Sequence, residues 1–165
     1  MNIKNEKGVT LIILVFSIIV LLILGGVSIV SGIDSIRKAK LETLKTNMLL
    51  IRVKGKEYCE EANFKIGTDN DLDKGTKYLS DEKQLKSPQT NPSFIDDTYD
   101  FIAKLDETEL KRIGLNEVAN SDNTGDFYIG FKIKDNQTEI YNSKGYKAKN
   151  GTTYYKLSDL ENIDE

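Results

Sequence analysis

The first hydrophobic feature of the chain is one long uncharged run. Between Val9 and Val30 no residue carries a charge, and the only polar side chains are those of Thr10, Ser17 and Ser28. A helix of about 22 residues spans roughly 33 Å, which matches a bilayer hydrocarbon core of about 30 Å. A helix that is apolar on every face needs lipid or a helical bundle around it. The run therefore predicts a membrane-spanning helix.

After this run the pattern becomes one-sided. Charged residues separate hydrophobic positions that recur close to helical spacing: Ile33, Ile36, Leu41, Leu44, Met48, Ile51 and Tyr58. We therefore expect the helix to continue as an amphipathic helix to about Ala62. The stripe from Ile36 to Tyr58 could instead serve a coiled coil or a partner. It is short and irregular for heptads, which favours packing on the chain's own globular domain.

The rest of the sequence predicts a small α+β domain. Residues 67–97 are polar and contain both prolines, so a long loop is expected there, with contacts to the globular domain as its source of order. Asp106 and Glu109 have the spacing of a capping box and predict a short helix. Residues 127–133 alternate between hydrophobic and polar, and two further short runs follow after turns. Together they predict a three-stranded antiparallel meander over about residues 126–157, with the helix stripe as its cover.

Composition narrows the function classes. The net charge is −3, from 23 basic and 26 acidic residues that are scattered along the chain, which argues against nucleic acid as the main partner. There is no histidine and one cysteine, Cys59, so intrachain disulfides and imidazole-based zinc sites or triads are excluded. We expect Cys59 to be a small buried residue. The alternatives are an intermolecular disulfide or a lipidation site.

Acidic residues give one candidate metal motif. Asp69, Asp71 and Asp73 alternate as in a calcium-binding loop. An EF-hand requires glycine at the sixth position and glutamate at the twelfth, where this chain has Lys74 and Ser80. A solvated acidic loop is therefore expected, and no cofactor or metal. No carboxylates stand in a recognisable catalytic spacing, so the sequence does not predict an enzyme.

The junction before the apolar run is more specific than the run itself. The charged leader Met1–Lys7 ends at Gly8, and Val9, Thr10 and Leu11 follow at once. This resembles the prepilin signal of type IV pilins and type II secretion pseudopilins. The resemblance implies that a prepilin peptidase cuts after Gly8 and methylates Val9, with Thr10 and Leu11 as the Thr-Leu pair of the family pattern.

Two residues depart from that pattern. The family usually has phenylalanine where Val9 stands and glutamate where Ile13 stands. The glutamate is thought to pair with the N-terminal amine of a neighbouring subunit, a charge that is costly in lipid. Its absence at Ile13 favours a minor or tip subunit, or a lineage with looser assembly rules, over a standard major pilin. In filaments of the family the helix partly unwinds near membrane-embedded glycines, and Gly25 and Gly26 stand where such a hinge is expected.

A secretory signal peptide is the competing interpretation of the N-terminus. A secretory signal peptide would have basic residues and an apolar core of about 7–15 residues, and this run is longer. Basic residues also follow the run at Arg37, Lys38 and Lys40, so the positive-inside rule gives no clear orientation. A cytoplasmic N-terminus is what the resemblance implies.

The resemblance also implies a domain organisation and a function. The expected parts are a leader (1–8), a transmembrane and assembly helix (9–32), its amphipathic continuation (33–62) and a pilin-like α+β head (63–165). We expect a structural subunit of a pilus or of a competence or secretion pseudopilus, of Gram-positive type. Its expected partners are the membrane, the prepilin peptidase and other pilin subunits, with the head on the cell surface. The alternative is a single-pass anchored extracellular binding domain that does not polymerise.

Overall fold

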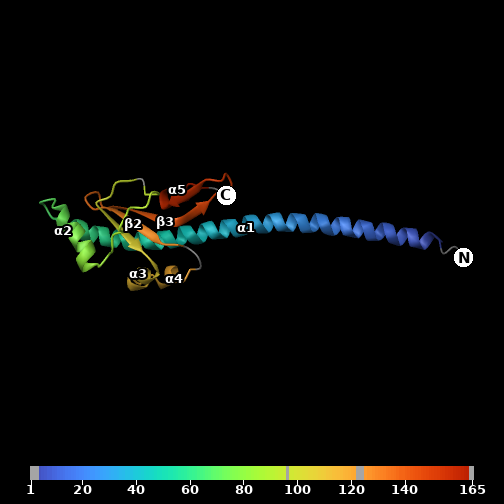
Figure 1. Ribbon diagram of the computed structural model, residues 1–165, viewed down its shortest axis with the longest axis horizontal. Helices are drawn as coiled ribbons and strands as arrows, with labels where there is room; N and C mark the ends of the chain where they lie inside the picture. Colours follow the sequence, from blue (N-terminus) through green and yellow to red (C-terminus); the bar gives the residue numbers. More distant parts are fainter. Residues whose placement is uncertain (1–3, 96, 122–124, 164–165) are drawn as a thin grey trace. The chain divides into compact units, whose positions relative to one another are not determined.

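The chain consists of two compact units, Met1–Lys40 and Leu41–Glu165. Helix α1 (Lys4–Ile66) contributes to both units and is labelled in Figure 1. The computed structural model describes the backbone of residues 4–95, 97–121 and 125–163, and within α1 the side chains of residues 14–21 and 32–66. Each unit is considered by itself below.

Unit Leu41–Glu165 has an α+β fold, as predicted. After α1 its elements are α2 (Leu72–Lys77), the π-helix η1 (Tyr78–Glu82), β1 (Phe101–Leu105), α3 (Glu107–Arg112), α4 (Asn116–Ala119), β2 (Phe127–Lys132), β3 (Gln137–Lys147), β4 (Thr153–Lys156) and α5 (Leu157–Glu161). The four strands form one antiparallel sheet in the order β1-β2-β3-β4. The predicted meander corresponds to β2, β3 and β4. The prediction of three strands was wrong, because β1 adds a fourth strand at the edge beside β2.

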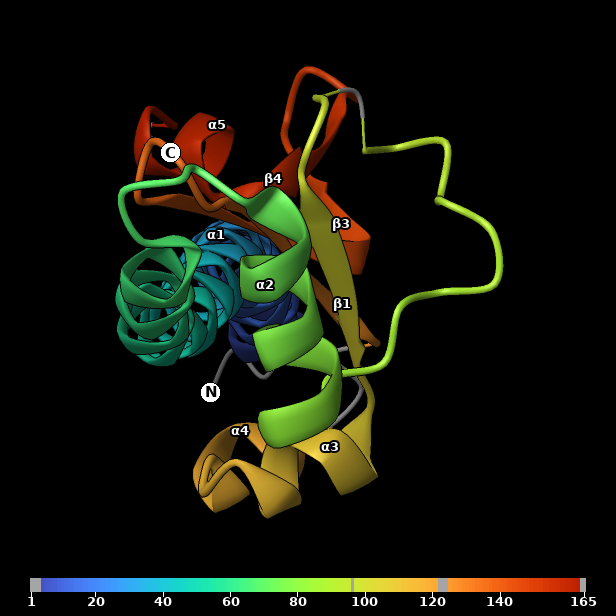
Figure 2. The same ribbon diagram turned by 90° about the vertical axis from the view of Figure 1, so that its left-hand side faces the viewer.

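The Leu41–Ile66 part of α1 packs on one face of this sheet (Figure 2). Gly55 lets the helix approach β2 closely, because a Cβ atom there would lie 3.3 Å from Cγ2 of Ile129. The Asn63 amide donates to the carbonyl of Ile133 at 2.7 Å, one residue beyond the predicted helix end. The helix ends at Ile66, and Gly67 follows with a φ of +59°, the left-handed conformation common after helices.

The predicted hydrophobic stripe is buried along most of its length. Five of its members belong to the core: Leu41, Leu44, Met48, Ile51 and Tyr58. Ile33 and Ile36, in the other unit, are exposed. The buried face of α1 therefore begins at Leu41, and the prediction that the covering stripe starts at Ile36 was wrong.

Residues 67–97 are more ordered than predicted. They contain α2, capped by an Asp71 carboxylate that accepts from the backbone amide of Asp73, and the π-helix η1. Lys83 fixes η1 on α1: its ammonium lies 4.7 Å from the ring centre of Tyr58 and 5.4 Å from that of Tyr78. The expectation of a long loop was wrong for residues 72–82, because cation–π and packing contacts order a polar sequence.

The other face of the sheet is covered by chain as well. We call residues 86–95 and 97–100 the strap, and Figure 2 shows it on the side of the sheet opposite α1. The ring of Phe94, in the strap, stacks on Tyr155 with centres 5.1 Å apart and meets Tyr128 edge-on at 5.6 Å. Tyr99 lies over Gly130, where a Cβ atom would come within 2.6 Å of its ring. Outward-facing residues of β2 are therefore buried too.

One carboxylate holds the end of the strap to the sheet. Oδ2 of Asp97 accepts hydrogen bonds from the hydroxyls of Tyr99 at 3.0 Å and Tyr141 at 3.1 Å, and it pairs with the Lys156 ammonium. The hydrogen bond from Lys156 is the largest of several interactions that lower the pKa of Asp97. The strap is thus bound through both an aromatic and an ionic contact.

Candidate functional site

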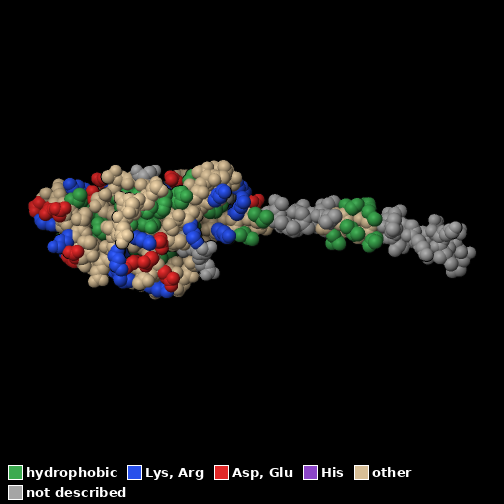
Figure 3. All heavy atoms as spheres, viewed as in Figure 1, with side chains coloured by type: hydrophobic (Ala, Val, Ile, Leu, Met, Phe, Trp, Pro, Cys, Tyr) green, Lys and Arg blue, Asp and Glu red, His purple; other side chains and the backbone are tan. Residues whose placement is uncertain are grey.

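Among the described residues of the first unit, one piece of α1 is almost wholly apolar and exposed. Seven of the eight residues from Leu14 to Leu21 are large hydrophobics, with exposed fractions from 43% for Val20 to 69% for Phe16. Eight residues make about two helical turns, so hydrophobic side chains point in every direction. Figure 3 shows this segment as a band of hydrophobic side chains. Exposed apolar surface of this extent marks a site of contact with a partner or with lipid.

The segment has no amphipathic character that would suit an aqueous surface. Removing apolar surface from water contributes about 25 cal/mol per Å². No side chain in Leu14–Leu21 is buried, so this gain is not realised within the unit itself. An external apolar environment is needed to supply it.

The sequence-predicted processing residues adjoin this segment. Gly8, Val9, Thr10, Leu11 and Ile13 fall within the bounds of α1, but their side chains lie outside the described residues. The same holds for the predicted hinge residues Gly25 and Gly26. The processing site and the hinge therefore stay predictions. Within the part of the chain whose side chains are described, no helix is both long and apolar enough to cross a membrane.

A second apolar surface lies on α1 within the Leu41–Glu165 unit. Leu49, Leu50, Val53 and Phe64 are exposed there, Val53 by 70% and Phe64 by 81%. Val53 and Phe64 stand eleven residues apart, close to three whole turns, and thus share one face of the helix. Sequence analysis missed this face because it followed only the inward stripe. The available signal was Val53, a β-branched residue between Arg52 and Lys54.

Cys59 does not contribute to either surface. It is fully buried, as predicted, and its thiol points at the backbone carbonyls of Lys132 and Gln137, with Sγ 3.9 and 3.6 Å from their oxygens. Burial raises the pKa of Cys59 to about 11. A protonated, enclosed thiol is a poor substrate for disulfide formation or lipidation.

The acidic loop has partners of its own. The carboxylates of Asp69 and Asp71 pair with the Lys74 ammonium at 3.1 and 3.6 Å. Among the described residues, no group of histidine, cysteine, aspartate or glutamate side chains is arranged to hold a metal ion.

The buried carboxylate of Glu109 on α3 has a structural role, because it pairs with Lys86 and Arg112. Burial disfavours the charged form of Glu109, but hydrogen bonds from Lys86 and Arg112 outweigh that effect and hold the Glu109 pKa below its usual value. Arg112 also donates to the carbonyls of Lys83 and Gln84. The predicted cap of this helix is confirmed, since Oδ1 of Asp106 accepts from the amide of Glu109 at 3.0 Å.

Comparison with models of known protein families, with characterised proteins and with solved structures found no match for this chain. The case for a function therefore rests on the residues and on their arrangement.

Proposed function

We propose that the chain is a structural subunit of a type IV pilus or of a competence or secretion pseudopilus. The observation that carries this proposal is the segment Leu14–Leu21, a helix with large apolar side chains exposed in all directions. It belongs to the apolar run that begins at Val9, directly behind a charged leader that ends at Gly8. That combination is similar to the prepilin signal, in which a charged leader precedes an apolar assembly helix.

The physical role of the segment follows from its two environments. Before assembly, residues 9–32 lie in the membrane with the N-terminus in the cytoplasm and the head outside. A prepilin peptidase cuts after Gly8, which removes the charged leader, and then methylates Val9. The shortened apolar helix then moves from lipid into a filament core, where other subunits cover the same side chains. Because both environments are apolar, the transfer does not require the hydrophobic side chains to enter water.

The Leu41–Glu165 unit supports the same role. Its exposed residues Leu49, Leu50, Val53 and Phe64 form a second apolar face on α1. A helix that buries one face on its own sheet and presents hydrophobic side chains on the opposite face is suited to contacts with neighbouring subunits. We therefore assign this face to subunit packing outside the membrane.

Ile13 bears on the position of the subunit in the filament. Most family members carry glutamate there, and isoleucine cannot pair with the N-terminal amine of a neighbour. A minor or tip subunit, which has fewer neighbours to align, tolerates that loss best. The same residue favours the second candidate function, an anchored extracellular binding domain that does not polymerise.

Filament incorporation separates the two functions. The chain, with an epitope tag at its C-terminus, is expressed in its own host, and surface filaments are sheared off and probed for the tag. A subunit is recovered with the sheared material, and substitution of Ile13 by glutamate increases its share. A tag that stays in the membrane fraction, with or without glutamate at position 13, supports the anchored domain.

A matched pair of glycine variants controls for folding. Gly8→Val blocks cleavage and keeps the subunit out of filaments. Gly32→Ala lies in the same helix, and its added Cβ atom would meet no described atom within 4 Å. It should enter filaments as the unaltered chain does. Equal incorporation of both variants would contradict a role for processing at Gly8.

A further inference from the structure

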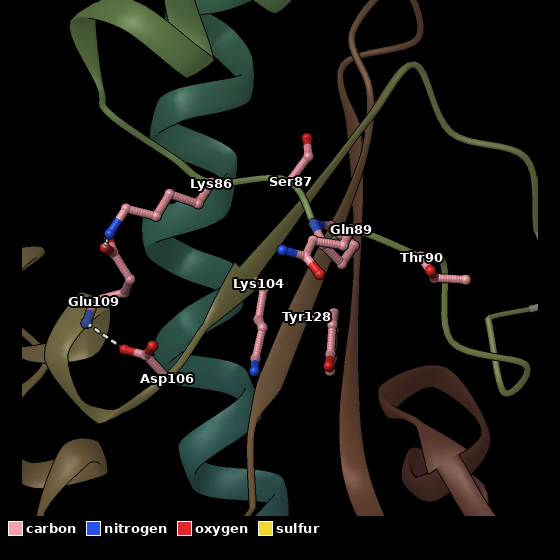
Figure 4. Close-up of a pocket in the computed structure, with 9 residues that line it drawn as sticks. Lys86, Ser87, Gln89, Thr90, Lys104, Asp106, Glu109 and Tyr128 are labelled. Atoms are coloured by element: carbon pink, nitrogen blue, oxygen red, sulfur yellow. Dashed lines mark hydrogen bonds and ion pairs between the residues drawn. The ribbon is translucent and has the colours of Figure 1, made fainter.

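The Leu41–Glu165 unit has a pocket between the start of the strap and the edge of the sheet (Figure 4). Its volume is about 470 Å³, within the range of about 300–1,000 Å³ typical of ligand sites. The lining residues come from the strap, β1, β2 and the start of α3: Lys86, Ser87, Pro88, Gln89, Thr90, Lys104, Asp106, Glu109 and Tyr128. The backbone amide of Lys104 donates to the carbonyl of Lys86 at 2.8 Å, which fixes the strap at the mouth.

The charged groups of the pocket are already compensated. The Lys86 ammonium pairs with Glu109 at 3.0 Å, and the Lys104 ammonium pairs with Asp126 at 2.9 Å. Oδ1 of Asp106 accepts from the backbone of α3. A charged ligand would have to break one of these pairs, which costs part of the energy that it gains.

The neutral polar groups of the pocket differ from its charged groups, because they lack such partners among the described residues. The side chains of Ser87, Gln89 and Thr90 are exposed to solvent, and neither they nor the Tyr128 hydroxyl make a hydrogen bond to the residues that the structure describes. Tyr128 is only 8% exposed. Its hydroxyl still reaches solvent, because Oγ1 of Thr138 is the only fully buried side-chain oxygen or nitrogen without a hydrogen-bond partner among the described residues. The hydroxyl therefore keeps access to the pocket and can bind a ligand.

We propose that this pocket binds a neutral saccharide unit. A sugar hydroxyl both donates and accepts, which suits the hydroxyls and the amide that line the pocket. The C–H face of a sugar ring is apolar and suits the ring of Pro88 and the Tyr128 side chain, which Phe94 holds in place by its edge-on contact. This binding function is independent of filament assembly.

Saturation-transfer NMR on the full chain tests the proposal. The protein is held in a zwitterionic detergent without a sugar headgroup, because a maltoside would compete for the pocket. The probes are cellobiose and N,N′-diacetylchitobiose, with glucuronic acid and glucosamine as charged comparators. Glucose is measured as the neutral monosaccharide. At least one neutral disaccharide should give a saturable signal, and both charged monosaccharides a weaker one than glucose. No saturable signal from either disaccharide, or stronger binding of a charged sugar, would overturn the proposal.

A pair of tyrosine variants locates the binding. Tyr128→Phe removes one hydroxyl and keeps the ring, and Gln89→Leu removes the amide; each should weaken binding by about three- to tenfold, as expected for one hydrogen bond. Tyr155→Phe removes a hydroxyl from the neighbouring Phe94 contact outside the pocket and should leave binding unchanged. If Tyr128→Phe and Gln89→Leu leave the affinity unchanged, or if Tyr155→Phe weakens binding equally, the sugar binds elsewhere and the assignment is refuted.

Discussion

Helix α1 contains two segments that meet their surroundings in different ways. In Leu14–Leu21 every residue is exposed, and all but Ser17 are large hydrophobics. In Leu41–Ile66 one face is buried against the sheet, while other positions carry charges and a smaller apolar patch. The second segment is covered by its own unit, whereas the first is not covered by any described residue of its unit. The sequence pattern of a helix therefore indicates how many of its sides require an apolar neighbour.

The largest effect is expected at the buried face of the second segment. Ile51 is completely buried, so Ile51→Ala should lower the free energy of unfolding by about 2–5 kcal/mol. Val53→Ala, two residues away and exposed, should change it by less than about 0.5 kcal/mol. Urea unfolding of the detergent-solubilised chain, followed by near-ultraviolet circular dichroism of the tyrosines, measures both. Equal losses would remove the distinction between the two faces.

The first segment should respond to charge instead of to cavity formation. An aspartate at the centre of a membrane helix costs about 2.5–3.5 kcal/mol. Ile18→Asp should therefore reduce membrane retention by about a hundredfold, since each 1.4 kcal/mol is a factor of about ten. Alkaline extraction of membranes gives the readout, and Val53→Asp provides the control with the same charge in the other unit. Retention of the Ile18 variant would show that lipid does not cover this segment.

A smaller loss is expected where the strap covers the sheet. Gly130→Ala places a Cβ atom 2.6 Å from the ring of Tyr99, so the ring has to move away. Overpacking of this kind costs about 1–3 kcal/mol in unfolding experiments. Gly32→Ala meets no described atom and is the control. If the two alanine variants unfold at the same urea concentration, the strap does not pack on β2 as described.

The smallest effect concerns Asp97 and depends on pH. Its folded pKa is lowered, chiefly by Lys156, so its contribution is present above the unfolded pKa of about 3.9 and is lost as the pH falls through the folded value. Asp97→Asn keeps an acceptor for the tyrosine hydroxyls and removes the charge. At pH 7 the variant should be less stable by about 1 kcal/mol or less, because the pair is partly exposed. The difference should shrink below pH 4; a constant difference would exclude the ion pair as its cause.

Local patterns predicted much of the Leu41–Glu165 unit. The alternation in residues 127–133 gave β2, and Asp106 gave the start of α3, because both signals depend on near neighbours. Strand β1 was missed because its support comes from pairing with a distant segment, as in the register Phe101↔Phe131. The π-helix η1 was missed for the same reason, since Lys83 orders it through Tyr58 on another element.

The candidate sites also differ in how far local sequence patterns predicted them. Charge and hydropathy alone indicated the apolar segment around Leu14–Leu21, and its exposure agrees with that pattern. The pocket could not be predicted, because Gln89 and Tyr128 stand far apart in the sequence and the strap brings them together. The outer face with Val53 and Phe64 required knowledge of which side of α1 the sheet occupies.

The intact mass and N-terminal sequence of the protein isolated from its own membranes decide whether it is a processed filament subunit. A filament subunit begins at Val9, carries one added methyl group on that residue's amine, and has lost the leader through Gly8. A protein that still begins with its leader, or one that lacks the whole apolar run, would contradict the account.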